Sequence, residues 1–298
     1  MTETQEIQSM TSGEAVVDGL VRNGIDTLFC LPGVQNDLFF DALHARTGEL
    51  RPIHTRHEQG AAYMALGAAL ATGKPSAFCV VPGPGFLNAS AALATAYSTN
   101  SKVLALLGQI NLAAIGRGYG LLHEVRDQMA ILRTMTKWAE RIENPSEAAR
   151  LTQEAFRQLG AGRPRPVGLE CPMDVWGRKA PVAMPDGPAE EEILPVDTDK
   201  VEEAAKLLGA AKNPMIVVGG GAQDASVEVR RLAEMLEAPV CGFCMGRGVL
   251  DSRHHLSITM PTGHQLWKDV DVVLGVGTRM QPHQQVWGTD KKLKIITL

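Results

Sequence analysis

Long apolar runs, excess basic charge and a cysteine framework are all missing from this sequence. The longest weakly polar run, 60–71, is much shorter than the ~20 residues that cross a bilayer. Lys and Arg number 29 against 33 Asp and Glu, and the net charge is −4, so no basic surface for nucleic acid is expected. Five cysteines in 298 residues are too few for a framework of disulfide bonds. The polar first ten residues do not have the pattern of a signal peptide. We therefore expect a cytoplasmic protein that binds neither nucleic acid nor a membrane.

Apolar runs that end in glycine or proline alternate with helical segments along the chain. The runs 76–81 and 102–107 are continuously apolar after their first residue, which is typical of parallel strands covered on both faces. Alternation of strands and helices indicates βαβ units. The predicted fold class is α/β, with two open, mainly parallel sheets flanked by helices.

A change in amino-acid composition near the middle of the chain predicts two domains. Residues 178–195 contain four prolines and the start of an acidic run, as expected of a linker. The predicted domains are 1–177 and a Rossmann-like 196–298. The sequence ends on a predicted strand, 294–298, so we expect the second domain to be truncated.

Four signals in the first domain follow predicted strands. They are the Pro32-Gly33 turn, Glu58 at the head of a small-residue helix, the segment 83–88 and the Gly108-Gln109 turn. Because ligands bind at the carboxyl edge of an open parallel sheet, these signals predict one site there. A glutamate in a first turn also suits the helix dipole, which is the structural alternative for Glu58 alone.

These motifs, in this order, resemble those of a known enzyme family. Leu31-Pro-Gly33, Arg56-His-Glu-Gln-Gly-Ala61, Gly83-Pro-Gly-Phe-Leu-Asn88 and Gly108-Gln109 resemble the N-terminal pyrimidine-binding domain of thiamine-diphosphate-dependent enzymes, in the acetolactate synthase-like branch. The second domain resembles the central domain of that family. The resemblance covers nearly the whole chain.

The resemblance implies an enzyme that cleaves or joins carbon–carbon bonds of a 2-keto acid. By the same resemblance, Glu58 is catalytic, because it hydrogen-bonds the pyrimidine nitrogen N1′ of the cofactor and promotes loss of the C2 proton. Further residues are implied to border the cofactor: Pro32, Gly33, Gly85 and Asn88. Gln109 is implied to face the substrate side, or a flavin if one is present.

Two departures from the acetolactate synthase pattern concern the substrate. Phe86-Leu87 replace Ala-Thr, and Leu122-His123-Glu124 stands where that branch usually has Phe-Gln-Glu. We therefore expect a substrate pocket that differs from that of acetolactate synthases. The resemblance does not identify pyruvate as the substrate. His123 is either an acid or base of that pocket or a surface or capping histidine.

A Gly-Asp-Gly sequence, which the family uses to bind Mg²⁺ and the diphosphate, does not occur in this sequence. We therefore expect the Mg²⁺ ligands in a C-terminal domain outside this chain and assign no metal ligand here. The resemblance also implies a homodimer or homotetramer whose active site is shared between subunits. The 298-residue chain alone is expected to be inactive, and the alternative is a non-catalytic fragment or nucleotide-binding module.

The second domain has weaker signals. Residues that could contact FAD or ADP follow predicted strands: Gly219, Gly220, Gly221, Arg247 and Arg279. The domain could equally bind no nucleotide. An NAD(P)-dependent oxidoreductase is a further alternative, although Asp224 stands where a dinucleotide fingerprint needs its last glycine. Cys241-Gly-Phe-Cys244 has no second pair, so two buried cysteines are expected rather than zinc or redox chemistry.

Overall fold

The computed structural model describes residues 7–190, 194–289 and 292–298. The chain forms two compact units, Met1–Leu194 and Pro195–Leu298, each with its own sheet and core. Residues 1–6 of the predicted amino-terminal pattern and residues 191–193 of the predicted linker lie outside the described residues. None of the helices in the described ranges is long and apolar enough to cross a membrane.

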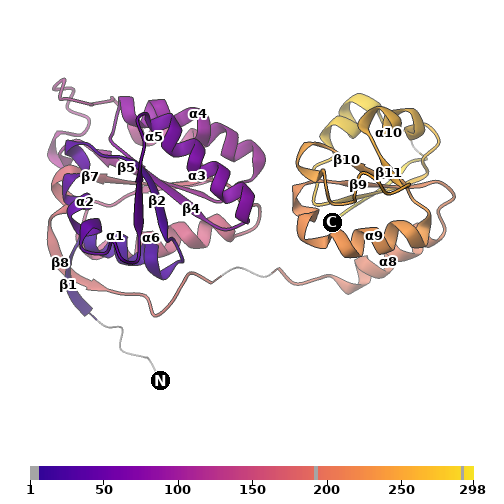
Figure 1. Ribbon diagram of the computed structural model, residues 1–298, viewed down its shortest axis with the longest axis horizontal. Helices are drawn as coiled ribbons and strands as arrows, with labels where there is room; N and C mark the ends of the chain where they lie inside the picture. Colours follow the sequence, from indigo (N-terminus) through magenta and orange to yellow (C-terminus); the bar gives the residue numbers. More distant parts are fainter. Residues whose placement is uncertain (1–6, 191–193, 290–291) are drawn as a thin grey trace. The chain divides into compact units, whose positions relative to one another are not determined.

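A six-stranded parallel sheet forms the centre of the first unit, and helices cover both of its faces (Figure 1). Its strand order is β3-β2-β4-β5-β7-β6. The strands are β2 (Thr27–Leu31), β3 (Arg51–His54), β4 (Ser76–Val80), β5 (Val103–Gln109), β6 (Trp138–Arg141) and β7 (Val167–Pro172). Every residue of β4, β5 and β7 is buried, as the continuous apolar pattern predicts.

The helices of the first unit form two layers with separate cores. One face of the sheet packs against α1 (Ser12–Arg22), α2 (Asp37–His44) and α6 (Pro145–Gly160). The other packs against α3 (Glu58–Thr72), α4 (Pro84–Thr99) and α5 (Gln128–Met135). Alanine and glycine dominate the sequences of α3 and α4, and the buried alanines of both helices belong to one core. The small side chains allow the two helices to approach each other closely.

Local sequence signals set the ends of these helices. The sequence Thr11-Ser-Gly-Glu14 has the pattern of a capping box, and the structure confirms it at the start of α1: Thr11 N donates to Glu14 Oε2 at 2.7 Å, and Glu14 N donates to Thr11 Oγ1 at 3.1 Å. The helix predicted over 58–72 begins at Glu58 and ends before Gly73, whose φ of +70° suits a residue without a side chain.

Two expectations about local structure at the site were wrong. The sequence pattern after the glycine-proline segment predicts a helix over 86–98, whereas α4 begins two residues earlier, at Pro84, because proline has the right φ for the first helical position and has no N–H group to leave unbonded. Gly85 therefore lies on α4 rather than in the turn before it, and Asn88 lies within the part of the helix that was predicted. Gly108 and Gln109 end strand β5 and do not form a turn.

Other differences from the sequence predictions are outside the main sheet. Strands β1 (Ile7–Thr11) and β8 (Lys179–Ala183), which were not predicted, form an antiparallel pair. The predicted linker therefore begins with a strand. Helix α5 was not predicted, and the sequence pattern indicates Ser146 as the cap of α6, whereas Asn144 caps it in the structure. Strand pairing across such a long stretch of chain leaves no periodic pattern in the local sequence.

The second unit has a five-stranded parallel sheet of order β11-β10-β9-β12-β13. Its strands are β9 (Pro214–Val218), β10 (Val240–Gly242), β11 (Ser257–Ile258), β12 (Val272–Val276) and β13 (Lys294–Thr297). Its helices are α8 (Thr198–Gly209), α9 (Ser226–Leu236) and α10 (Met260–Trp267). Strand β11 and helix α10 were not predicted. The two parallel sheets flanked by helices confirm the predicted fold class (Figure 1).

Candidate functional site

Glu58 is the first residue of α3 and lies just beyond the carboxyl end of β3. His57 caps the helix, and its Nδ1 accepts a hydrogen bond from Gln59 N at 3.2 Å. The Glu58 side chain is half-buried. One of its oxygens, Oε2, accepts a hydrogen bond of 3.0 Å from Asn88 Nδ2 on α4. Among the described residues, no donor reaches the other oxygen, Oε1, within hydrogen-bond distance. The carboxylate is thus oriented by one partner and still able to bind another.

Two predicted glycines lie against the same side chain, that of Val81. A Cβ built on Gly85 would lie 2.6 Å from Val81 Cγ2 and 3.6 Å from Glu58 Oε1, and one built on Gly33 would lie 2.5 Å from Val81 Cγ1. Both glycines therefore allow close packing against Val81, and Gly85 in addition lies next to the Glu58 carboxylate. Val81 itself is buried, and nothing in its sequence context marked it.

Pro32 lines a surface pocket at the edge of the sheet. The pocket has a volume of about 540 Å³. It is lined by Cys30, Pro32, Asp37, Phe40, Asp41, Pro52 and His54. Burial raises the pKa of the Cys30 thiol to about 11. Glu58 and Asn88 are not part of this lining, so the structure does not bring Pro32 and Glu58 into one pocket.

Gln109 is buried, and its side chain hydrogen-bonds to Glu170 rather than to Glu58. Its Nε2 donates to Glu170 Oε2 at 3.1 Å, and its Oε1 accepts from Ile110 N at 2.8 Å. Glu170 is fully buried on β7 and also accepts from Arg141 Nε at 2.5 Å. The charged Glu170 inside the otherwise apolar segment 167–171 is a sequence signal of this buried hydrogen-bond network. It was not used to predict the network.

His123 borders the glycine turn that precedes α4. Its backbone has a φ of +68°, and a Cβ on Gly83 would lie 2.4 Å from the His123 carbonyl oxygen. The ring Nδ1 lies 3.1 Å from Gln35 Oε1, and the side chain is half-buried. His123 is therefore held next to the turn but does not contact Glu58.

The glycine turn after β9 packs against the turn after β12. Gly219 N donates to Val276 O at 3.0 Å, and Gly221 N donates to Gly277 O at 3.2 Å. A Cβ on Gly221 would lie 2.9 Å from Gly277 Cα, and one on Gly220 would lie 3.2 Å from Met245 Cβ. Close backbone packing is therefore one reason for these glycines.

Most of the other candidates in the second unit are exposed. Arg247 and Arg279 have exposed side chains. Cys241 is buried and Cys244 is exposed, so the expectation of two buried cysteines was wrong for Cys244. Burial raises the pKa of the Cys241 thiol to about 11. Across the described ranges, no group of three or more His, Cys, Asp or Glu side chains is placed to hold a metal ion.

Each of the two units matches the model of a known protein family. The model of the thiamine pyrophosphate enzyme N-terminal TPP-binding domain matches residues 10–131, and that of the central domain matches residues 201–298. The chain belongs to the thiamine pyrophosphate enzyme family. The predicted resemblance is thereby confirmed.

Curated relatives agree with this assignment. A probable 2-ketoarginine decarboxylase of Pseudomonas aeruginosa is 34% identical over 284 residues, which are 93% of this chain and 50% of that protein. The acetolactate synthase of Arthrospira platensis is 32% identical over 86% of this chain and 45% of its own. A probable acetolactate synthase large subunit of Methanocaldococcus jannaschii is 33% identical, with 91% and 47% covered. The chain thus spans about half the length of the relatives it matches.

Proposed function

We propose that the chain supplies the cofactor-activating half of a thiamine-diphosphate-dependent enzyme that acts on a 2-keto acid. The observation that carries this proposal is the Glu58 carboxylate, which Asn88 orients through Oε2 while Oε1 accepts no hydrogen bond from the described residues. The carboxylate lies at the carboxyl edge of a parallel sheet, where such folds bind ligands. Relatives named acetolactate synthase and 2-ketoarginine decarboxylase support the reaction class.

We propose that a flat heteroaromatic ring binds beside Glu58, next to Gly85. Neither Gly33 nor Gly85 has a Cβ, and at both positions that atom would collide with Val81. Gly85 thus packs against Val81 and places no side chain next to Glu58 Oε1, beside which the ring is proposed to bind. Bound thiamine diphosphate supplies the acidic C2 carbon at which the keto acid reacts.

Within this site, Glu58 holds a proton between Oε1 and a ring nitrogen of the cofactor, which is the role of a general acid–base group. Asn88 keeps the carboxylate in the orientation that presents Oε1. Because the side chain of Glu58 is half-buried in the single chain, covering it with a second subunit would remove water and strengthen this interaction.

We propose that a second copy of the chain covers the Glu58 side chain. Large apolar side chains on α3 and α4 are exposed, namely Tyr63, Met64, Leu70 and Leu87, each 41–44% exposed. They lie on the two helices that carry Glu58 and Asn88. We propose a homodimer, or a homotetramer made of two such dimers, in which Mg²⁺ and the diphosphate are held by residues outside these two units.

The substrate pocket is proposed to differ from that of acetolactate synthase. His123 lies against Gly83, at the turn that starts α4, and stands where the acetolactate synthase-like pattern has glutamine. This supports a 2-keto acid other than pyruvate as the donor.

FAD remains a candidate ligand of the second unit. Gln223 Nε2 donates to Met245 O at 2.7 Å and to Arg247 O at 3.1 Å, and so ties the two glycine-rich segments together. A flavin that co-elutes with the protein in gel filtration, with its visible absorbance, would support this assignment. Elution of all added flavin with the small molecules would remove it.

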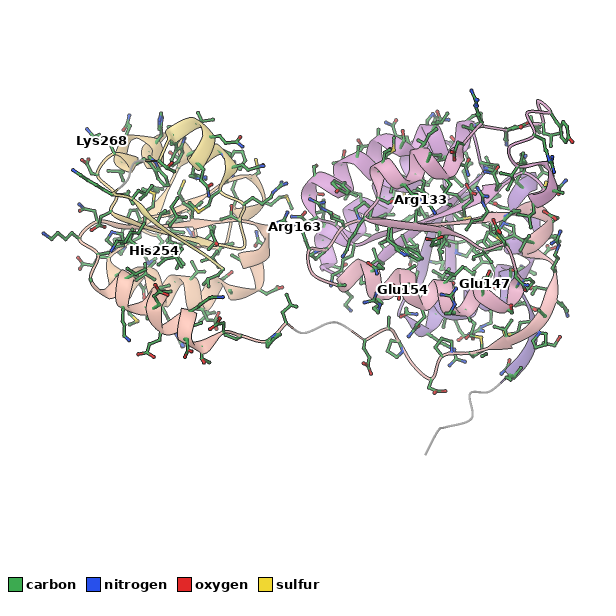
Figure 2. The ribbon with its side chains drawn as sticks, turned by 180° about the vertical axis from the view of Figure 1, so that it is seen from behind. Arg133, Glu147, Glu154, Arg163, His254 and Lys268 are labelled. Atoms are coloured by element: carbon green, nitrogen blue, oxygen red, sulfur yellow. The ribbon has the colours of Figure 1, made fainter. Side chains whose placement is uncertain are left out.

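The function is tested by the substitution Glu58→Gln in the complete enzyme. We expect the fold to persist and C2 proton exchange of bound cofactor, followed by NMR, to slow at least ~100-fold. The matched control is Glu147→Gln in the first turn of α6, whose Oε1 lies 3.6 Å from Arg150 on the same helix (Figure 2). Equal exchange rates in the Glu58→Gln variant and the parent enzyme would remove the assignment.

A further inference from the structure

Glu170 is a fully buried carboxylate for which the proposed mechanism has no role. It lies on β7, and three donors reach it: Arg141 Nε at 2.5 Å, Gln128 Nε2 at 2.7 Å and Gln109 Nε2 at 3.1 Å. Burying a charge is costly unless it is paired and hydrogen-bonded. Both oxygens of Glu170 accept hydrogen bonds. Each neighbouring polar side chain must therefore turn a donor group toward Glu170.

Gln128, the first residue of α5, connects Glu170 to the segment that follows β4. Its side chain is 1% exposed, and its amide makes three hydrogen bonds. Nε2 donates to Glu170 and, at 3.0 Å, to the Gly108 carbonyl oxygen. Oε1 accepts from Gly83 N at 2.7 Å. A single amide thus joins the carboxyl ends of β4, β5 and β7.

The charge on Glu170 determines which way this amide faces. A carboxylate accepts hydrogen bonds and cannot donate them, so the NH₂ end of Gln128 faces Glu170. The carbonyl end is then left for Gly83. If the amide were reversed, its NH₂ group would face the Gly83 N–H group, and two buried donors would oppose each other.

Gly83 determines where α4 begins. It precedes Pro84 with φ +56° and ψ −117°, a conformation that glycine adopts without strain. The next residues include Gly85, which lies against Glu58, and Asn88, which donates to Glu58 Oε2. A displacement of Gly83 would therefore move Asn88 relative to Glu58.

We propose that Gln128 and Glu170 are positioning residues of the Glu58 site: the buried Glu170 carboxylate orients the Gln128 amide, which fixes Gly83 and hence the register of α4 against α3. The link to catalysis rests on the proposed function, whereas the structural link does not. Neither residue lies in a motif that the sequence analysis singled out.

The structural link is tested in the 298-residue chain without cofactor, by NMR of the Gly83 amide and the Asn88 side-chain amide. Gln128→Met should speed hydrogen exchange of the Gly83 amide at least tenfold and shift the Asn88 side-chain signals toward those of a free amide. The control is Asn23→Leu. Asn23 is also an amide with three hydrogen bonds, to Gly19, Gln153 and Ala189, and its loss should leave both signals in place.

Exchanging the two groups gives a second test. Gln128→Glu and Glu170→Gln should each disturb the Asn88 signals, since the first opposes two carboxylates and the second frees the amide to reverse. The double variant restores one donor and one acceptor between positions 128 and 170 and should recover part of the parent spectrum. Double-variant spectra displaced by the sum of the single effects would overturn the proposal, as would unchanged Gly83 and Asn88 signals in Gln128→Met.

The catalytic link is tested in the complete enzyme by C2 proton exchange at saturating cofactor. Gln128→Met should slow exchange about tenfold, whereas Asn23→Leu should lower only the thermal midpoint. If Glu58→Gln slows exchange but Gln128→Met does not, the positioning role is wrong and the proposed function stands. If Glu58→Gln has no effect while the NMR predictions hold in the shorter chain, the proposed function is wrong and the structural link stands.

Discussion

Asn88 Nδ2 donates a 3.0 Å hydrogen bond to Glu58 Oε2 and so joins α4 to the first turn of α3 across 30 residues of sequence. Asn88 is exposed and Glu58 half-buried, so packing alone does not hold the carboxylate in place. The amide determines which oxygen is occupied and which is left to bind a partner.

Replacing Asn88 with leucine should weaken catalysis while preserving the fold. A hydrogen bond to a charged group contributes about 1.5–3 kcal/mol, and each ~1.4 kcal/mol corresponds to tenfold in rate. Since the bond is on the surface of the single chain, we expect the lower end, a roughly tenfold slower C2 exchange in the complete enzyme. Ser90→Ala, on the same helix, is the control and should exchange at the parent rate. A fall of equal size in both variants would show that α4 as a whole had been perturbed.

Gly85→Ala should destabilise the first unit because the new Cβ would lie 2.6 Å from Val81 Cγ2. Overpacking of this kind typically costs about 1–3 kcal/mol. Shortening the opposing side chain removes the clash, so Val81→Ala combined with Gly85→Ala should lose less stability than the two single changes added together. Urea unfolding of the four proteins measures this coupling. Additive losses would mean that the two residues do not meet.

The exposed apolar side chains on α3 should lie in a subunit interface. Met64→Glu with Leu70→Glu places two charges among them, and desolvating these charges on association is unfavourable. Sedimentation at micromolar concentration should show a dimer for the parent and a monomer for the double variant. Met235→Glu on α9, where Met235 is 80% exposed, should remain dimeric. A monomeric parent would remove the shared site.

The 298-residue chain should bind thiamine diphosphate weakly and with little dependence on Mg²⁺. Phosphates are held mainly through metal ions and charge-assisted hydrogen bonds, and among the described residues no cluster is placed to hold a metal. Calorimetry with and without Mg²⁺ checks this. Tight, metal-dependent binding to this chain would point to a phosphate site within it, with 219–221 as the first segment to test by substitution.

The two cysteines of the second unit should differ in reactivity. Only the thiolate is nucleophilic, and a pKa of about 11 leaves about one Cys241 thiol in a thousand ionised at pH 8. Iodoacetamide should therefore alkylate the exposed Cys244 first, and modification of Cys241 should accelerate as pH rises toward 11. Peptide mapping by mass spectrometry separates the two. Faster labelling of Cys241 at pH 8 would mean that this strand end opens readily.

Local physics made much of the fold predictable. The continuous apolar runs determine buried parallel strands, because only a strand covered on both faces tolerates apolar side chains in both directions. The capping box at Thr11 and the glycine at 73 mark helix ends, since they satisfy backbone groups within a few residues. Glu58 could be singled out for the same reason, because it follows a strand and begins a helix.

Only the tertiary structure decided what depends on residues far apart in the chain. The pairing of β1 with β8, the approach of Gly33 and Gly85 to one valine, and the Gln128 amide that joins three strand ends leave no periodic trace in the sequence. The sequence determined that a carboxylate would stand at the edge of a parallel sheet. Which of its oxygens is bound, and which buried groups hold the neighbouring helix in register, was decided by packing and hydrogen-bond geometry, because these require atoms from separate segments to meet within about 3 Å.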